Sequence, residues 1–118
     1  MPRRLFPIAL MLAGLPVSAA PSSSEQYRPG FPTCAAYFFL AARGHDASRY
    51  DALYRAGEFA LNNAIKAEGH PAAQARMGSE STVMMREIEQ DWRLIERLDR
   101  KYAGGCEALL RDAHFETP

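Results

Sequence analysis

The sequence is poor in cysteine and lysine, with two residues of each, and it lacks the short motifs that accompany redox or metal chemistry. It contains no Cys-x-x-Cys, Cys-x-x-Cys-His or His-Glu-x-x-His motif, which argues against a dithiol redox site, a c-type haem and a zinc-protease helix. No segment shows the strict alternation of a half-buried β-strand. The sequence therefore predicts an all-helical protein that is not an enzyme and holds no cofactor or metal ion.

The first nineteen residues have the pattern of a cleavable secretion signal. Arg3 and Arg4 form a positive start, residues 5–15 form a short apolar run, and residues 17–19 are small enough for signal peptidase. The apolar run is too short to cross a membrane, which takes roughly 20 residues. We therefore expect cleavage after Ala19, no membrane span in the mature protein, and a periplasmic or secreted bacterial protein.

Removal of residues 1–19 from the 118-residue chain leaves 99 residues, enough for one domain. Residues 20–32 are rich in Ser, Pro and Gly and predict an irregular arm, followed by a helical domain at residues 33–118. Because Arg3 and Arg4 are removed with the signal, the mature chain has 12 basic and 14 acidic residues. This balance argues against a nucleic-acid partner, which requires a basic surface.

The two cysteines, Cys34 and Cys106, lie 72 positions apart. In an oxidising compartment, one such pair is most simply a disulfide. A metal pair or a redox pair would normally have further cysteines or histidines nearby in the sequence, and there are none. We therefore predict a disulfide that ties the start of the helical domain to its last segment.

Apolar spacing and capping residues predict three main helices and a short last one. The first spans about residues 33–43, and the second spans residues 49–68 with Ser48 as its cap. The third starts at Pro71, breaks at Gly78 and Ser79, and continues over residues 80–102. Glycines at 104 and 105 end it, and residues 106–113 form the last helix. These elements predict a small antiparallel bundle.

The second predicted helix carries its large apolar residues on one face. Tyr50, Leu53, Tyr54 and Leu61 follow helical spacing, so we expect this face to be buried. Gly57 lies within it and costs roughly 1 kcal/mol of helix propensity relative to alanine. A glycine there predicts the close approach of a neighbouring helix.

Three apolar residues fall outside the predicted inner faces. Phe59 points away from the inner face of the second helix, and Val83 with Leu94 would share one side of the third. The N-terminal arm is expected to cover Phe59, or else Phe59 contacts a partner. Val83 and Leu94 would contact either a partner or the last helix. We therefore name Phe59, Val83 and Leu94 as candidate partner contacts.

Two chemical alternatives follow from other residues. His70, Met77 and Met84 recur every seventh residue and would suit Cu(I), but successive positions lie about 10 Å apart on a helix, too far for one ion. Asp91 and Asp99 lie near the inner face of the third helix, where they either do acid–base chemistry or pair with an arginine or a tyrosine hydroxyl. We expect such pairing, because no nucleophile accompanies them.

These observations favour a binding or interaction protein of the bacterial cell envelope, such as an inhibitor, an immunity-type protein or an accessory subunit. Its partner would be another envelope protein. The alternative is a helical bundle that binds a small ligand or a metal such as copper. The case for a protein partner rests on the small disulfide-stapled scaffold and on apolar residues in surplus to one core.

Overall fold

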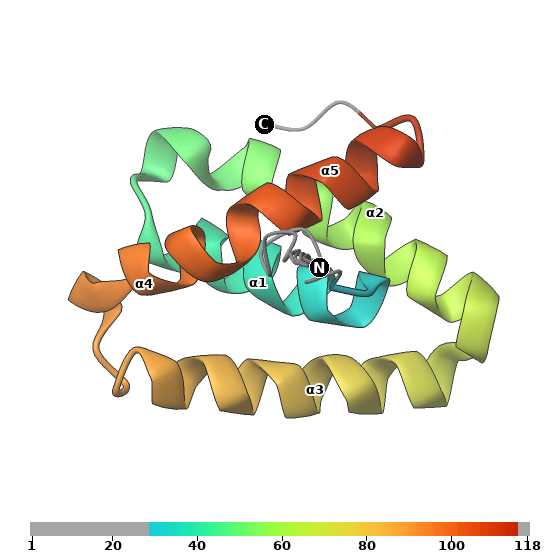
Figure 1. Ribbon diagram of the computed structural model, residues 1–118, viewed down its shortest axis with the longest axis horizontal. Coiled ribbons are helices and arrows are strands. Elements are labelled where there is room, and N and C mark those ends of the chain that lie inside the picture. The colour runs from blue at the N-terminus through green and yellow to red at the C-terminus, as the bar shows by residue number, and fades with distance from the viewer. Residues whose placement is uncertain (1–28, 116–118) are drawn as a thin grey trace, which may run out of the picture.

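The computed structural model describes residues 29–115, which form a helical bundle (Figure 1) with no β-strand within that range. Three main helices, α1 (Phe31–Gly44), α2 (Tyr50–Glu68) and α3 (His70–Glu87), are followed by a segment that ends in the short helix α5 (Gly104–Asp112). The predicted all-α bundle is therefore confirmed. The predicted signal at 1–19, and the predicted arm up to residue 28, lie outside the described residues.

Helix α1 is the central helix of the bundle and lies between α3 and α5 in Figure 1. It begins at Phe31, two residues before the predicted start, because Pro32 suits a first helical turn, where its missing N–H has no helical partner to lose. Its middle is almost entirely apolar or small, so it is buried on most sides. The buried residues are Pro32, Cys34, Ala35, Ala36, Tyr37, Phe38, Ala41 and Ala42.

Helix α2 buries small residues instead of the tyrosines that the sequence predicts. Its buried residues are Leu53, Ala56, Gly57, Ala60 and Ala64. The helix is therefore rotated about its axis, and Tyr50 and Tyr54 are exposed. Small side chains at the contact allow α1 and α2 to pack closely, which favours this rotation over burial of the larger rings. The predicted cap at Ser48 is wrong: Ser48 lies in a 3₁₀ turn, η4 (Ala47–Arg49), and α2 has no side-chain cap.

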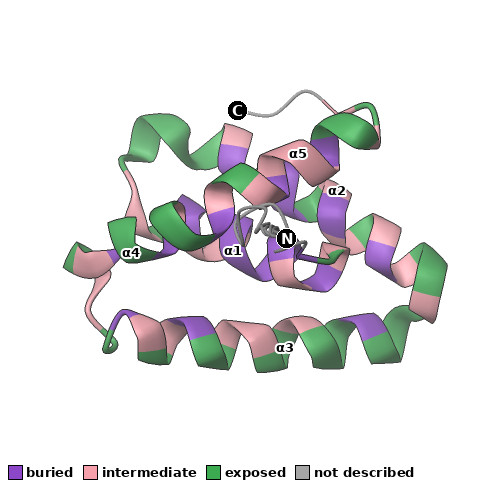
Figure 2. Ribbon diagram, viewed as in Figure 1, coloured by how far each residue is buried: buried purple, intermediate pink, exposed green. Residues whose placement is uncertain are grey.

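Helix α3 starts as predicted, with Pro71 in its first turn, and it runs through Gly78 and Ser79 without a break. Ala73, Met84 and the adjoining Ile88 are buried, and Figure 2 shows the buried and half-buried residues on the side that faces α1. Gly78 is exposed and nothing lies within 4 Å of where its Cβ would be. This glycine therefore weakens the helix without ending it.

The predicted continuation of this helix to Tyr102 is wrong, because α3 ends at Glu87. The Gln90 N–H donates to the Met85 carbonyl and the Glu89 N–H donates to the Arg86 carbonyl, which is the Schellman pattern of a helix end. Glu89 has a φ of 56° and Gln90 a φ of 59°, in the left-handed region where glycine is usual. The helix end was missed in the sequence because no glycine marks it.

The chain then returns along α1 in a helical segment of mixed geometry. It comprises the 3₁₀ turn η5 (Trp92–Leu94), the short helix α4 (Glu96–Leu98), the π turn η6 (Asp99–Ala103) and α5. The predicted stop at Gly104 is wrong, because the helix runs through it. Residues three or four apart along this segment share its inner face. The buried residues of this face are Ile95, Leu98, Tyr102, Cys106 and Leu110.

The predicted disulfide between Cys34 and Cys106 is confirmed. Their Cα atoms lie 5.4 Å apart, the sulfur atoms are at bonding distance, and both residues are fully buried. The bond joins the first turns of α1 and α5 across the core. A disulfide is compatible with a location outside the reducing cytoplasm. Among the described residues, no helix combines the length and the apolar character needed to span a membrane.

Candidate functional site

Among the described residues, two of the three exposed large apolar side chains, Tyr50 and Tyr54 in the first turns of α2, form an aromatic cluster with Phe39 of α1, which we call the tyrosine face. The Tyr50 and Tyr54 rings stack with centroids 5.5 Å apart, and Phe39 of α1 meets Tyr54 edge-on at 5.1 Å. Tyr50 is 42% exposed and Tyr54 38% exposed. Three rings in contact thus lead from a half-buried position on α1 out to the surface.

Gly57 makes room for the innermost ring of this cluster. A Cβ atom at this position would lie 2.7 Å from two ring atoms of Phe39, closer than such atoms approach in proteins. The close approach that the sequence predicts at Gly57 is therefore confirmed, and the neighbour is the Phe39 side chain. Phe39 therefore packs against the inner side of the Tyr54 ring, and this contact restricts the exposed Tyr54 side chain.

Alanine substitution at two glycines tests this role. Gly57→Ala is expected to destabilise the protein by about 1 kcal/mol, because overpacking against Phe39 outweighs the gain in helix propensity. Gly78→Ala is the matched control and is expected to stabilise by about 1 kcal/mol, because its surroundings are open. Urea unfolding of both variants measures the difference. Equal stabilisation by both changes would contradict the proposed contact.

A second group of side chains forms a polar cluster where α1 ends beside the π turn. The Tyr37 hydroxyl donates to Asp99 Oδ1 at 2.6 Å, and His45 Nε2 lies 2.8 Å from Asp99 Oδ2. Both oxygens of the Asp99 carboxyl group are therefore engaged, one by each residue. Tyr37 is 2% exposed, and the side chains of His45 and Asp99 are 14% and 26% exposed. The cluster joins segments 62 and 54 positions apart in the sequence.

This cluster confirms the expectation that Asp99 pairs with a tyrosine hydroxyl, while Asp91 pairs with Arg93 at 2.9 Å. His45 is a residue that the sequence analysis did not single out, because its partner is distant in the chain. Burial raises the pKa of the Tyr37 hydroxyl well above its usual range, and its hydrogen bond to Asp99 adds to the effect. Tyr37 therefore stays a hydrogen-bond donor at any ordinary pH.

The raised pKa of Tyr37 predicts a loss of stability in alkali. The unfolded chain releases the tyrosine proton at a pH near 10, whereas the folded chain retains it, so stability falls as the pH rises above about 10. Tyr37→Phe is expected to make this decline shallower, with the remainder due in part to Tyr102. Urea unfolding at a series of pH values from 9 to 11 (approximate limits) measures the slope. An unchanged slope in Tyr37→Phe would refute the assignment.

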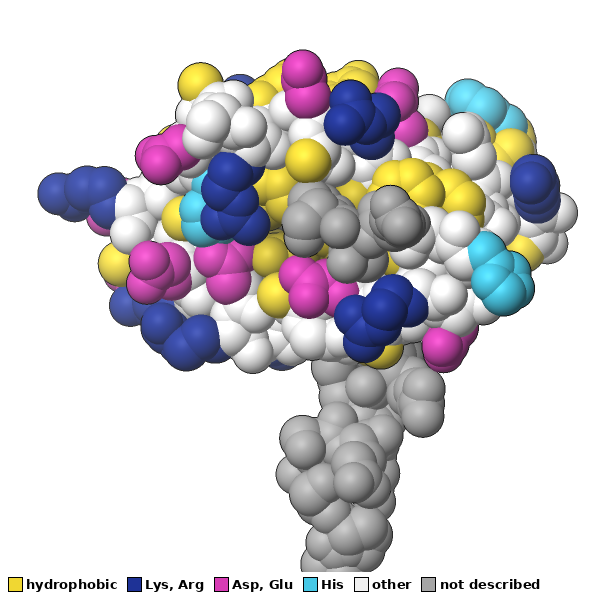
Figure 3. All heavy atoms as spheres, turned by 90° about the horizontal axis from the view of Figure 1, so that it is seen from above, with side chains coloured by type: hydrophobic (Ala, Val, Ile, Leu, Met, Phe, Trp, Pro, Cys, Tyr) yellow, Lys and Arg dark blue, Asp and Glu magenta, His cyan; other side chains and the backbone are white. Residues whose placement is uncertain are grey.

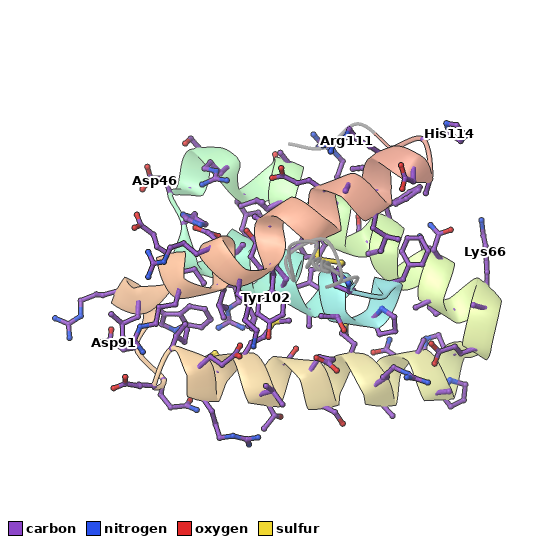
Figure 4. All side chains as sticks on the ribbon, in the orientation of Figure 1. Asp46, Lys66, Asp91, Tyr102, Arg111 and His114 are labelled. Carbon is purple, nitrogen blue, oxygen red and sulfur yellow. A yellow bond between two sulfur atoms is a disulfide. The ribbon has the colours of Figure 1, made fainter. Side chains whose placement is uncertain are left out.

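A third contact ties the π turn to the end of α3. The Tyr102 hydroxyl donates to Glu87 Oε1 at 2.8 Å, and Lys101 pairs with the other carboxylate oxygen. Figure 4 shows Tyr102 between the returning segment and α3. Burial, followed by the Glu87 hydrogen bond, raises the pKa of Tyr102 to about 12. This contact holds the two helical segments together across the chain reversal at residues 88–91.

The structure places the three predicted contact residues in different surroundings. The Phe59 ring stacks on Phe115 with centroids 4.5 Å apart, so the end of the described chain covers it. Leu94 is partly buried against the core, and Val83 is 38% exposed. Val83 and Leu94 do not share a helix, because α3 ends between them. A role of these residues in partner contact stays a prediction.

Phe115 reaches Phe59 because of the way α5 ends. The Phe115 N–H donates to the Leu110 carbonyl and the His114 N–H donates to the Arg111 carbonyl, a second Schellman pattern. His114 has a φ of 68° at the position where glycine is usual. The turn directs the chain back onto α2. Figure 4 shows His114 at the tip of this turn, away from the bundle.

The three residues considered for copper binding, His70, Met77 and Met84, differ in how far they are buried. Met84 is fully buried, Met77 is partly buried against the core, and His70 is exposed at the start of α3. Within residues 29–115, no three side chains of the His, Cys, Asp and Glu types lie close enough together to hold a metal ion. The methionines act here as core side chains.

Comparison of the chain with protein-family models, with curated proteins and with solved structures gave no match. The described part of the chain offers two distinct features: a partly buried polar cluster that joins distant segments, and an exposed aromatic face that packs on Phe39.

Proposed function

We propose that this protein is an exported helical binding protein of the bacterial cell envelope, and that it contacts another protein through the tyrosine face. The observation that supports this proposal is the pair of exposed, stacked rings of Tyr50 and Tyr54, held by Phe39. Tyrosine is enriched among the residues that dominate protein interfaces, because it supplies a large apolar ring and a polar hydroxyl.

The scaffold suits this role because a disulfide cross-links it. The buried bond between Cys34 and Cys106 fixes α1, and α1 carries Phe39, the support of the tyrosine face. A contact surface that is ordered before binding loses less conformational entropy when its partner arrives. The disulfide and the predicted signal at residues 1–19 both suit an oxidising compartment outside the cytoplasm.

The charge of the surface favours a protein over a polyanion as the partner. Acidic and basic side chains are interspersed on the face shown in Figure 3, in keeping with the formal net charge of +0 for the whole chain. A nucleic acid would require a continuous basic surface. Protein interfaces instead combine a core enriched in aromatic residues with a polar rim.

Capture from envelope extract tests the proposal. The mature, oxidised protein serves as bait beside the double variant Tyr50→Ala/Tyr54→Ala, and recovery of each specifically captured protein is quantified. The double variant is expected to lose about tenfold or more in apparent affinity, as removal of two interface anchors would cause. Gln74→Ala, at an exposed polar position of α3, is the matched control, and Val83→Ala tests the alternative contact surface that the sequence predicts.

Equal capture by the wild-type protein and the tyrosine variant would overturn the proposal. A loss with Val83→Ala alone would move the contact surface to α3 and favour the residues that the sequence analysis named. Circular dichroism of each variant establishes that the helical bundle is intact before capture is compared.

A further inference from the structure

The charged residues beside the tyrosine face form a pattern that is complementary to itself when the helix direction is reversed. Along α2 the order is Tyr50, Asp51, two residues, Tyr54, Arg55, so that an aromatic–acidic pair is followed one turn later by an aromatic–basic pair. All four residues are exposed. At about 100° per residue, the tyrosines form one edge of this surface and the two charged residues the other edge.

Asp51 and Arg55 have no ion-pair partner among the residues that the structure describes. Their order and spacing would allow a pair within the helix, yet none forms. Both charges are therefore available to a partner at the same surface as the exposed rings. Their signs are opposite, so a single-sign partner would satisfy one of them and repel the other.

We propose that the partner of the tyrosine face is a second copy of this chain, bound through α2 in an antiparallel, two-fold symmetric contact; this rests on the proposed function because it uses the same face. In such a contact, each edge of one helix meets the same edge of its copy in reverse order. Asp51 then faces Arg55 of the copy, Tyr50 faces Tyr54 of the copy, and both contacts occur twice. One alignment, centred between residues 52 and 53, therefore satisfies both the charged edge and the aromatic edge.

Charge reversal at Asp51 and Arg55 tests this alignment, because reversing both charges together should restore the association that either single reversal weakens. Sedimentation equilibrium of the mature, oxidised protein over a micromolar to millimolar series gives the dimerisation constant. With Asp51→Arg alone, an arginine at position 51 faces Arg55 of the copy, and this repulsive contact occurs twice. With Arg55→Asp alone, an acid at position 55 faces Asp51 of the copy, again twice. Each change is therefore expected to weaken association by about tenfold or more. The double variant Asp51→Arg/Arg55→Asp restores opposite charges and is expected to recover most of the wild-type association.

Two further variants complete the test. Tyr54→Ala is expected to weaken association as strongly as either single charge reversal, and Gln74→Arg, on the exposed side of α3, is expected to leave it unchanged. Thermal melting checks that every variant is folded. A wild-type protein that stays monomeric throughout the series would overturn the inference, and so would a double charge reversal that fails to rescue.

These outcomes are separate from those of the proposed function. If the wild-type protein is monomeric but still loses a captured envelope protein on Tyr50→Ala/Tyr54→Ala, the second-copy inference fails and the proposed function stands. If association and capture are both indifferent to the tyrosines, both proposals fail.

Discussion

Replacement of both Cys34 and Cys106 by alanine is expected to lower the free energy of unfolding by about 4 kcal/mol. The bond closes a loop of 72 residues, and in the chain-entropy model a loop of this length restricts the unfolded chain to about that extent. The loss is comparable with the whole stability of a small domain, which is about 5 kcal/mol at the low end. α5 depends on the bond most, because its inward contacts are confined to a few residues such as Leu110.

Urea unfolding of the double alanine variant, compared with the oxidised wild-type protein, measures this loss. The reduced wild-type protein is the matched control, since it lacks the bond but retains both sulfur atoms. Both forms are expected to lose similar stability. A variant that unfolds at the same urea concentration as the oxidised protein would show that the bond contributes nothing.

Asp99→Ala is expected to destabilise the protein by about 3 kcal/mol. The change removes two hydrogen bonds to a charged group and leaves the buried Tyr37 hydroxyl without its acceptor, and an unpaired buried hydroxyl alone costs about 1–3 kcal/mol. Asp99→Asn is expected to cost less, because the amide oxygen still accepts from Tyr37. Glu96→Ala, at an exposed acid on α4, is the control and is expected to change stability by no more than about 0.5 kcal/mol.

A double-mutant cycle attributes this effect to the polar cluster. Asp99→Ala and Tyr37→Phe, made singly and together, are expected to be strongly non-additive, because once Tyr37 lacks its hydroxyl no buried donor is orphaned. Additive effects in urea unfolding would mean that the hydrogen bond between the two residues does not account for the loss.

The sequence predicts the fold class and the disulfide because both follow from local or compositional signals. Pro32 and Pro71 mark helix starts, Gly57 marks a close helix contact, and a chain with two cysteines allows one pairing. These features depend on backbone geometry and redox environment, which a single residue type can reveal.

The tyrosine face could not be predicted because small residues decide how α2 is rotated. A periodicity that is weighted toward large apolar side chains places Tyr50 and Tyr54 inside, whereas Ala56 and Ala60 form the contact with neighbouring helices. Close packing of backbones across small residues has no strong hydrophobic signature in a sequence.

The end of α3 and the place of His45 in the polar cluster were missed for a different reason. Glu89 and Gln90 adopt left-handed conformations at the end of α3, where glycine is the usual signal. The contact between His45 and Asp99 joins residues 54 positions apart, and nothing local to either residue indicates it. Such features appear only when the whole chain is folded.

The most direct test of the tyrosine face as the contact surface is site-specific photocrosslinking in the cell that produces the protein. A photoreactive phenylalanine derivative replaces Tyr54 in one variant and Gln74, on the exposed side of α3, in another, and products are identified by mass spectrometry after irradiation. We expect a discrete crosslinked product at position 54, with a second copy of the chain in it, and none at position 74. Equal crosslinking at both positions, or none at position 54, would contradict it.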